Sequence, residues 1–163
     1  MVSKQQSIEN KIVTREVLAH LCAGWRVKGH KIVFTNGCFD LLHRGHIATL
    51  LAAAEAGDKV VVGLNTDASV QQLKGPTRPV QQEDDRAFIM AAQAYVDAVV
   101  LFGEETPLEL IQAIQPDIIV KGGDYSPESV VGKDVVEARG GKVIIVPLEA
   151  GRSTTNIIGK MKG

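Results

Sequence analysis

The sequence predicts an α/β fold: an open, mostly five-stranded parallel sheet with helices on both faces. Two observations indicate this fold. Short apolar runs rich in Val and Ile alternate along the 163 residues with longer segments of helical character. Each apolar run is nearly continuous, which is typical of parallel strands buried on both faces. Right-handed crossovers then bring the carboxyl ends of all the strands to one edge of the sheet, where ligands bind in such folds.

The expected strands come first, because they define that edge. They are Lys31–Thr35, Lys59–Leu64, Asp97–Leu101, Asp117–Lys121 and Lys142–Pro147. Glycines mark the ends of the segments between them, at Gly57 and at Gly140-Gly141, where helices should stop.

The segments between the strands are the expected helices. We predict helices over Arg15–Val27, His46–Ala56, Glu83–Tyr95, Pro107–Ile114 and Glu128–Ala138, and a short last helix from Thr154. Thr106 and Pro107 fit an N-cap and a first helical position. Residues 1–30 are therefore expected to be an N-terminal extension with one helix packing on the core, and residues 31–163 the main part of a single structural domain.

Composition narrows the function classes. Lys and Arg total 18 against 19 Asp and Glu, for a net charge of −1, which argues against a broad basic surface for nucleic acid. Two cysteines, Cys22 and Cys38, are too few for a disulfide framework. Met1–Asn10 is polar, unlike a signal peptide, and no apolar run approaches the ~20 residues of a membrane span. We expect a cytoplasmic protein with neither nucleic-acid nor membrane partners.

The segment after the first strand, Asn36–His46 (NGCFDLLHRGH), has the features of a phosphate site. Gly37 allows a tight turn and a close approach of the backbone, and the next helix offers free N–H groups. His43 and His46, three residues apart, would face the same ligand. The alternatives are that one histidine caps the helix and the other packs or faces solvent, or that the pair binds zinc. A zinc site lacks further ligands, since Cys38 alone does not complete it, so no metal ligands are predicted.

Cations follow the second strand. Asn65-Thr66-Asp67 ends that strand and can cap the next helix. The long non-periodic stretch Lys74–Gln82 carries Lys74 and Arg78, and the next predicted helix carries Arg86. Three cations in a short span could neutralise a polyphosphate, or each could simply be solvated at the surface.

The last two strand ends complete the pattern. Lys121-Gly122-Gly123-Asp124 allows a ligand to lie against the backbone, with Asp124 as an acceptor for a ribose or amino group, although a capped glycine turn explains the same residues. Ser153-Thr154-Thr155 before the last helix forms ordinary N-caps or a second phosphate cradle. Two cradles at one sheet edge favour a nucleotide polyphosphate as ligand.

These residues also carry a family resemblance. His43-Arg44-Gly45-His46 after a strand, with Ser153-Thr154-Thr155 opening the last helix, resembles the HxGH nucleotidylyltransferase superfamily. Longer segments are similar to its D-glycero-β-D-manno-heptose 1-phosphate adenylyltransferases, namely Thr35–His46, Leu64–Gly75, Arg78–Val80, Val120–Tyr125 and Ser153–Ile158. The resemblance runs from about Val13 to the end. It implies a Rossmann-like nucleotidylyltransferase domain over residues 31–163. This domain is often fused to a sugar kinase, and the chain resembles the domain alone.

The resemblance implies that AMP moves from ATP to the sugar 1-phosphate, giving ADP-heptose for lipopolysaccharide core synthesis and pyrophosphate. Mg²⁺ would enter with ATP rather than sit in a fixed protein cage, and the resemblance also implies a homodimer. The residues implied for catalysis are His43, His46, Lys74 and Arg86, the last assisting the leaving pyrophosphate. The expected nucleotide-binding residues are Asn36, Gly37, Cys38, Phe39, Asp40, His46, Asn65, Lys121, Gly122, Asp124, Ser153, Thr154 and Thr155.

Two alternatives stay open at the level of the sequence. One is the same fold with another acceptor, FMN or glycerol 3-phosphate. Glycerol-3-phosphate cytidylyltransferases carry an Arg-Thr pair shortly before the final Ser-Thr motif, whereas this chain has Leu148-Glu149, which counts against glycerol phosphate. The other is an ATP-binding domain without turnover. No role is predicted for Arg152.

Overall fold

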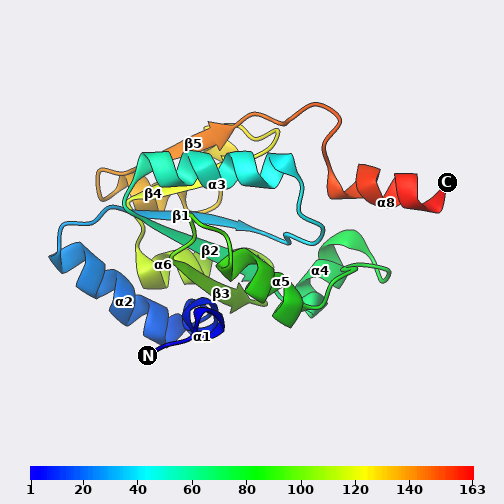
Figure 1. Cartoon of the computed structure of the whole chain (residues 1–163). Coiled ribbons are helices and arrows are strands. Elements are labelled where there is room, and N and C mark those ends of the chain that lie inside the picture. Colours follow the sequence, from blue (N-terminus) through cyan, green and yellow to red (C-terminus); the bar gives the residue numbers. More distant parts are fainter.

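The computed structural model describes residues 1–163 and contains one parallel sheet with the strand order β3-β2-β1-β4-β5 (Figure 1). The strands are β1 (Ile32–Gly37), β2 (Lys59–Asn65), β3 (Ala98–Phe102), β4 (Ile118–Gly122) and β5 (Lys142–Val146). Each predicted strand is present, with its ends shifted by a residue or two. The predicted fold class is therefore confirmed.

The helices are α1 (Lys4–Glu9), α2 (Arg15–Val27), α3 (Arg44–Ala56), α4 (Asp67–Lys74), α5 (Glu83–Ala91), α6 (Leu108–Ile114), α7 (Lys133–Glu137) and α8 (Thr154–Lys162), with a 3-10 turn η1 (Pro127–Ser129). None of them is both long and apolar enough to cross a membrane.

Two hydrophobic cores lie on the two faces of the sheet. Helices α2, α6 and α7 cover one face, where Leu18 of α2 and Ile111 of α6 are completely buried against Phe34 of β1. Helices α3 and α5 cover the other, where Leu50 and Met90 pack with Val33 of β1. Since neighbouring strand residues point to opposite faces, both faces of β1 must be apolar, and its apolar run follows from this.

Several predicted helix boundaries need correction. The helix expected over Glu83–Tyr95 ends at Ala91, and the one expected over Glu128–Ala138 divides into η1 and α7. Residues 1–30 hold two helices, α1 and α2, whereas only α2 was predicted. Helix α4 was also missed, so Lys74 is the last residue of a helix and not a loop residue. Short helices with few buried residues carry little hydrophobic periodicity, which explains both omissions.

The two ends of the chain are attached differently. Near the N-terminus, Lys11 and Val13 exchange backbone hydrogen bonds with Val99, so this segment covers the β3 edge of the sheet. At the other end, α8 projects away from the sheet beyond the tips of the strands (Figure 1), and none of its residues is buried.

Candidate active site

A pocket of about 600 Å³ opens at the carboxyl edge of the sheet, between the segments that follow all five strands. Its volume suits a nucleotide. The predicted site residues that line it are Asn36, Gly37, Cys38, Phe39, Asp40, His43, His46, Asn65, Lys74, Lys121, Gly122, Ser153, Thr154 and Thr155. Arg86 and Asp124 do not line it. In the sheet, β1 lies between β2 and β4, and the chain crosses over in one direction before this point and in the other direction after it. The pocket lies at this change of direction, where ligands bind in open α/β sheets.

His43 and His46 both cap α3 and both line the pocket. The Nδ1 atom of His43 accepts the N–H of Gly45 at 3.1 Å, and the Nδ1 atom of His46 accepts the N–H of His43 at 3.3 Å. Because each Nδ1 is an acceptor, the proton of a neutral ring resides on Nε2. Helix capping, which the sequence left open as an alternative to ligand binding, is therefore present in the structure. It also leaves both Nε2 atoms as donors.

The two rings stack with centroids 3.8 Å apart. Burial, with a smaller effect of His43, lowers the pKa of His46 to about 4. Burial and the charge of Arg152 lower the pKa of His43. Both imidazoles are thus neutral near pH 7 and can each offer an N–H to a phosphate oxygen.

Phe39 shapes the turn before the histidines. Its φ of 43° lies in the left-handed region, which is unfavourable for a residue with a side chain. Its ring packs edge-on against His46, with centroids 5.2 Å apart. A Cβ on Gly37 would lie 3.2 Å from the Phe39 ring, so Gly37 makes room for this packing.

Asp40 fastens the loop after α4 to the site. Asp40 as a residue is only 2% exposed, and its oxygens accept hydrogen bonds from Arg78 Nε at 2.9 Å and from the N–H groups of Val80 and Gln81 at 2.8 and 2.9 Å. Burial opposes ionisation of Asp40, but these donors outweigh it and lower its pKa. With both oxygens occupied, Asp40 positions the loop and has little capacity left for a nucleotide.

Arg86 is a correction to the sequence prediction. Its side chain is fully buried, and its guanidinium donates to the carbonyls of Gln81, Cys38 and Asn65 and to the carboxylate of Asp67, at 2.7–3.0 Å. It therefore joins the segments after β1 and β2 beneath the pocket instead of contacting the leaving pyrophosphate. Sequence alone could not distinguish a buried arginine from an exposed one.

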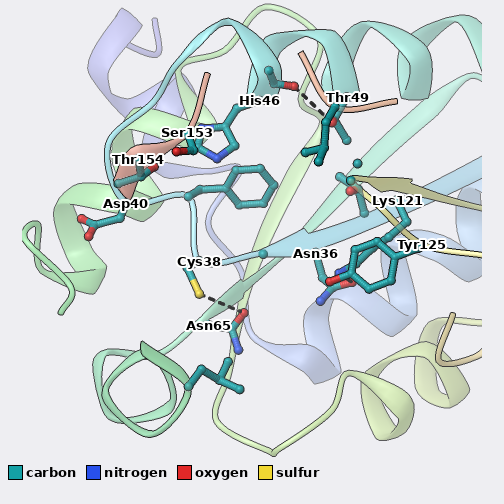
Figure 2. Close-up of a pocket in the computed structure, with 18 of the residues that line it drawn as sticks. Asn36, Cys38, Asp40, His46, Thr49, Asn65, Lys121, Tyr125, Ser153 and Thr154 are labelled. Atoms are coloured by element: carbon teal, nitrogen blue, oxygen red, sulfur yellow. Dashed lines mark hydrogen bonds between the residues drawn. The ribbon is translucent and has the colours of Figure 1, made fainter. Parts of the chain in front are cut away.

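Asn36, Lys121 and Tyr125 form a second cluster in the pocket (Figure 2). Lys121 Nζ donates to Asn36 Oδ1 at 3.3 Å and lies 5.2 Å from the centre of the Tyr125 ring. Burial lowers the pKa of Lys121. Tyr125 lines the pocket and was not predicted, whereas the neighbouring Asp124 is exposed outside it. Side chains alternate in direction after a strand end, so the adjacent residues Asp124 and Tyr125 lie on opposite sides.

Thr49 is another lining residue that sequence reasoning missed. It lies one turn of α3 after His46, and its Oγ1 donates to the carbonyl of Gly45 at 3.2 Å. A Cβ on Gly122 would clash with this hydroxyl, so α3 and β4 meet here only because Gly122 has no side chain. The spacing of three residues from His46 places Thr49 on the same side of the helix, and this spacing was the sequence signal that could have identified it.

The wall on the α8 side is held by two hydroxyls. Ser153 Oγ accepts the N–H of Asn156 at 3.0 Å as the N-cap, and Thr154 Oγ1 donates to the carbonyl of Leu41 at 2.9 Å. Figure 2 shows Ser153 and Thr154 on the same side of the pocket as His46. Glu149 and Arg152 also line this wall.

Asn65 and Cys38 lie at the base of the pocket. Asn65 Nδ2 donates to Ser69 Oγ at 2.8 Å, and its Oδ1 is 4.0 Å from Cys38 Sγ. Burial raises the pKa of the Cys38 thiol, so it stays protonated at neutral pH. No group of three or more His, Cys, Asp or Glu side chains is arranged to hold a metal ion.

The chain matches a known family along most of its length. Residues 34–159 match the family described as cytidylyltransferase-like. Among curated relatives, the bifunctional protein HldE of Caulobacter sp. (strain K31) is 59% identical over 152 residues, which are 93% of this chain and 31% of that protein. The bifunctional protein HldE of Trichlorobacter lovleyi is 58% identical over 153 residues, 94% of this chain and 31% of that protein. The chain thus spans about a third of the length of these relatives.

Solved structures show the same fold. The lipopolysaccharide core biosynthesis protein of Thermoplasma volcanium has a TM-score of 0.60 and 29% identity, covering 74% of this chain and 98% of that one. The pantoate-β-alanine ligase of Francisella tularensis has a TM-score of 0.61 and 16% identity, covering 88% of this chain and 68% of that one. At that identity, the second similarity concerns the fold alone.

Proposed function

Because the chain belongs to the cytidylyltransferase-like family and is a nucleotidyltransferase, we propose that it transfers AMP from ATP to D-glycero-β-D-manno-heptose 1-phosphate, forming ADP-heptose and pyrophosphate for lipopolysaccharide core synthesis. The observation that carries the proposal is the stacked pair of neutral histidines in the pocket, whose Nε2 atoms are free to donate. Two N–H donors on adjacent rings suit oxygens of a phosphate chain.

The reaction needs little covalent chemistry from the protein. An oxygen of the sugar phosphate attacks the α-phosphorus of ATP and forms a new P–O bond, while the bond from that phosphorus to the bridging oxygen breaks. Pyrophosphate leaves with the electron pair. The nucleophile is already an anion at neutral pH, so no general base is required. Positioning and charge stabilisation by His43, His46 and Lys74 supply the catalysis.

Mg²⁺ enters this scheme as part of the MgATP substrate. The pocket-lining carboxylate closest to the histidines in sequence, Asp40, uses both oxygens in hydrogen bonds and an ion pair. With both oxygens occupied, Asp40 has little capacity to hold a resident ion. The ion would be held by the phosphates of ATP.

The acceptor is supported by two similarities of different kinds. The sequence segments resemble heptose 1-phosphate adenylyltransferases, and a structural neighbour at 29% identity is named as a lipopolysaccharide core biosynthesis protein. In the same proposal, residues 31–163 form the catalytic domain, residues 1–30 are an extension to it, and ATP as substrate favours the cytoplasm. A homodimer belongs to the proposal too, and light scattering tests it.

The deciding experiment measures pyrophosphate release from the purified chain with ATP or CTP and with heptose 1-phosphate, glycerol 3-phosphate or FMN. We expect turnover with ATP and the heptose phosphate alone. The His46→Ala variant should lose about 100- to 1,000-fold in kcat. The matched control is His20→Ala, which removes an exposed histidine of α2 and should change kcat less than twofold. Turnover with another pair would move the chain to a different acceptor, and ATP binding without any release would leave a binding domain.

A further inference from the structure

The cations of the pocket differ in how they are held. Arg78 forms an ion pair with buried Asp40, and Lys121 donates to Asn36. Arg152 is also part of the lining, but its side chain is 48% exposed, and its Nε is 3.9 Å from the nearest oxygen of Glu149. This distance is at the limit of an ion pair, and exposed pairs of this kind bind weakly. Arg152 therefore has a charge that is available to a ligand.

The backbone places Arg152 beside the histidines. Thr154 Oγ1 fixes the start of α8 to Leu41. A Cβ on Gly45, between the two histidines, would lie 3.9 Å from the carbonyl oxygen of Arg152. The charge of Arg152 reaches His43, whose pKa it lowers in addition to burial. A cation and two N–H donors thus converge on one part of the pocket.

From this geometry we propose that Arg152 contacts the phosphates of the nucleotide during the reaction, and that a polyphosphate displaces the weakly paired carboxylate of Glu149 from Arg152. The inference rests on the proposed function and adds a residue for which no role was predicted from the sequence. An anion located between Arg152 and His43 would pair with the guanidinium charge. It would also satisfy the donors on both sides.

The local turn explains why Glu149 competes for Arg152. The N–H of Arg152 donates to the carbonyl of Glu149 at 3.1 Å, and Gly151 adopts a φ of 70°, which brings the two side chains to the same side of the turn. One partly exposed carboxylate carries a single charge. The β- and γ-phosphates of ATP carry several, so they should displace it readily.

The test compares Arg152→Gln, Arg152→Lys and Glu149→Gln with Lys160→Gln, which removes a positive charge from α8 away from the pocket. We expect Arg152→Gln to lose at least about tenfold in kcat/KM for ATP and Arg152→Lys to recover part of it. Glu149→Gln should raise kcat/KM for ATP about twofold or more, because the competing charge is gone. Lys160→Gln should stay within twofold.

A binding measurement tests the role of Arg152 independently of the proposed function. Calorimetric titration with inorganic pyrophosphate and Mg²⁺ requires no acceptor, so it applies even if no acceptor is turned over. We expect at least about tenfold weaker pyrophosphate binding in Arg152→Gln, and a raised pKa of His43 in its NMR titration because a nearby positive charge is lost. If Arg152→Gln binds pyrophosphate within twofold of the wild type, or Glu149→Gln does not bind it more tightly, the inference is wrong.

Discussion

The two walls of the pocket are built in opposite ways. The histidine wall (Asn36–His46) is anchored from below by Asp40 and Arg86, which are 2% and 1% exposed and have their hydrogen-bonding groups occupied by neighbouring loops. The arginine wall (Leu148–Thr155) leads into α8, which buries no residue, and the hydrogen bond from Thr154 to Leu41 ties it to the rest.

This difference between the walls means that the histidine wall fixes the geometry of the site, whereas the arginine wall supplies charge. A buried polar network holds the histidines in one orientation, because leaving any of its groups unpaired is costly. The exposed wall can supply phosphate ligands without contributing much to folding. Changes in the histidine wall should therefore alter stability and activity together, and changes in the arginine wall should alter activity with little effect on stability.

The largest expected effect breaks the anchor of the histidine wall. Arg86→Met keeps the apolar stem but leaves the Asp67 carboxylate and three carbonyls without their donor. We expect a loss of about 3–5 kcal/mol in the free energy of unfolding, measured by urea denaturation. Arg86→Lys should lose less, since an ammonium can serve some of the same acceptors. A loss below about 1 kcal/mol in Arg86→Met would show that the network is not an anchor.

Removing α8 should do the reverse. Truncation after Ser153 deletes a helix without buried residues, so the free energy of unfolding should change by less than about 1 kcal/mol. Loss of Thr154 and Thr155 from the phosphate cradle should lower kcat/KM for ATP about 100-fold. A truncated chain that melts far below the full chain would contradict the contrast between the walls.

Acidification should lower the free energy of unfolding through His46 of the histidine wall. His46 has a folded pKa of about 4, below the ordinary value of 6.5, so the unfolded chain binds more protons between these values. Stability from this group is complete above pH 6.5 and is lost as the pH falls toward 4. We expect a loss of about 1–2 kcal/mol between pH 7 and pH 5. Denaturation curves of His46→Gln should show a smaller loss over the same range, and equal losses would refute the assignment.

The smallest expected effect concerns the one tie of the arginine wall. Thr154→Val removes the hydroxyl that donates to Leu41 and retains the size of the side chain. We expect about 0.5–1 kcal/mol of lost stability and a few-fold rise in KM for ATP with little change in kcat. Thr155→Val is the matched control for stability, since no hydrogen bond of its hydroxyl holds the loop. An equal loss of stability in both variants would exclude the tie.

The sequence was sufficient for the sheet and for the strand ends that line the pocket, and the reason is the same for both. Buried parallel strands such as Lys59–Asn65 need continuous apolar runs, and the residues that follow them must meet at one edge. The sequence could not show that Arg86 is buried or that Asp124 faces away from the pocket. Those outcomes depend on contacts with segments distant in the chain. Helix α1 was missed because it buries no residue and so imposes no pattern.

The position of β1 in the sheet also has a consequence for biosynthesis. β1 pairs with β4, and the Lys121–Asn36 hydrogen bond joins residues 85 positions apart. Contacts of such long sequence separation form late, since the intervening chain must first be closed into a loop. A nascent chain that has emerged only as far as β3 holds both histidines but lacks the lining residues Lys121, Tyr125 and Ser153–Thr155. Nucleotide binding should therefore appear only when nearly the whole chain has left the ribosome.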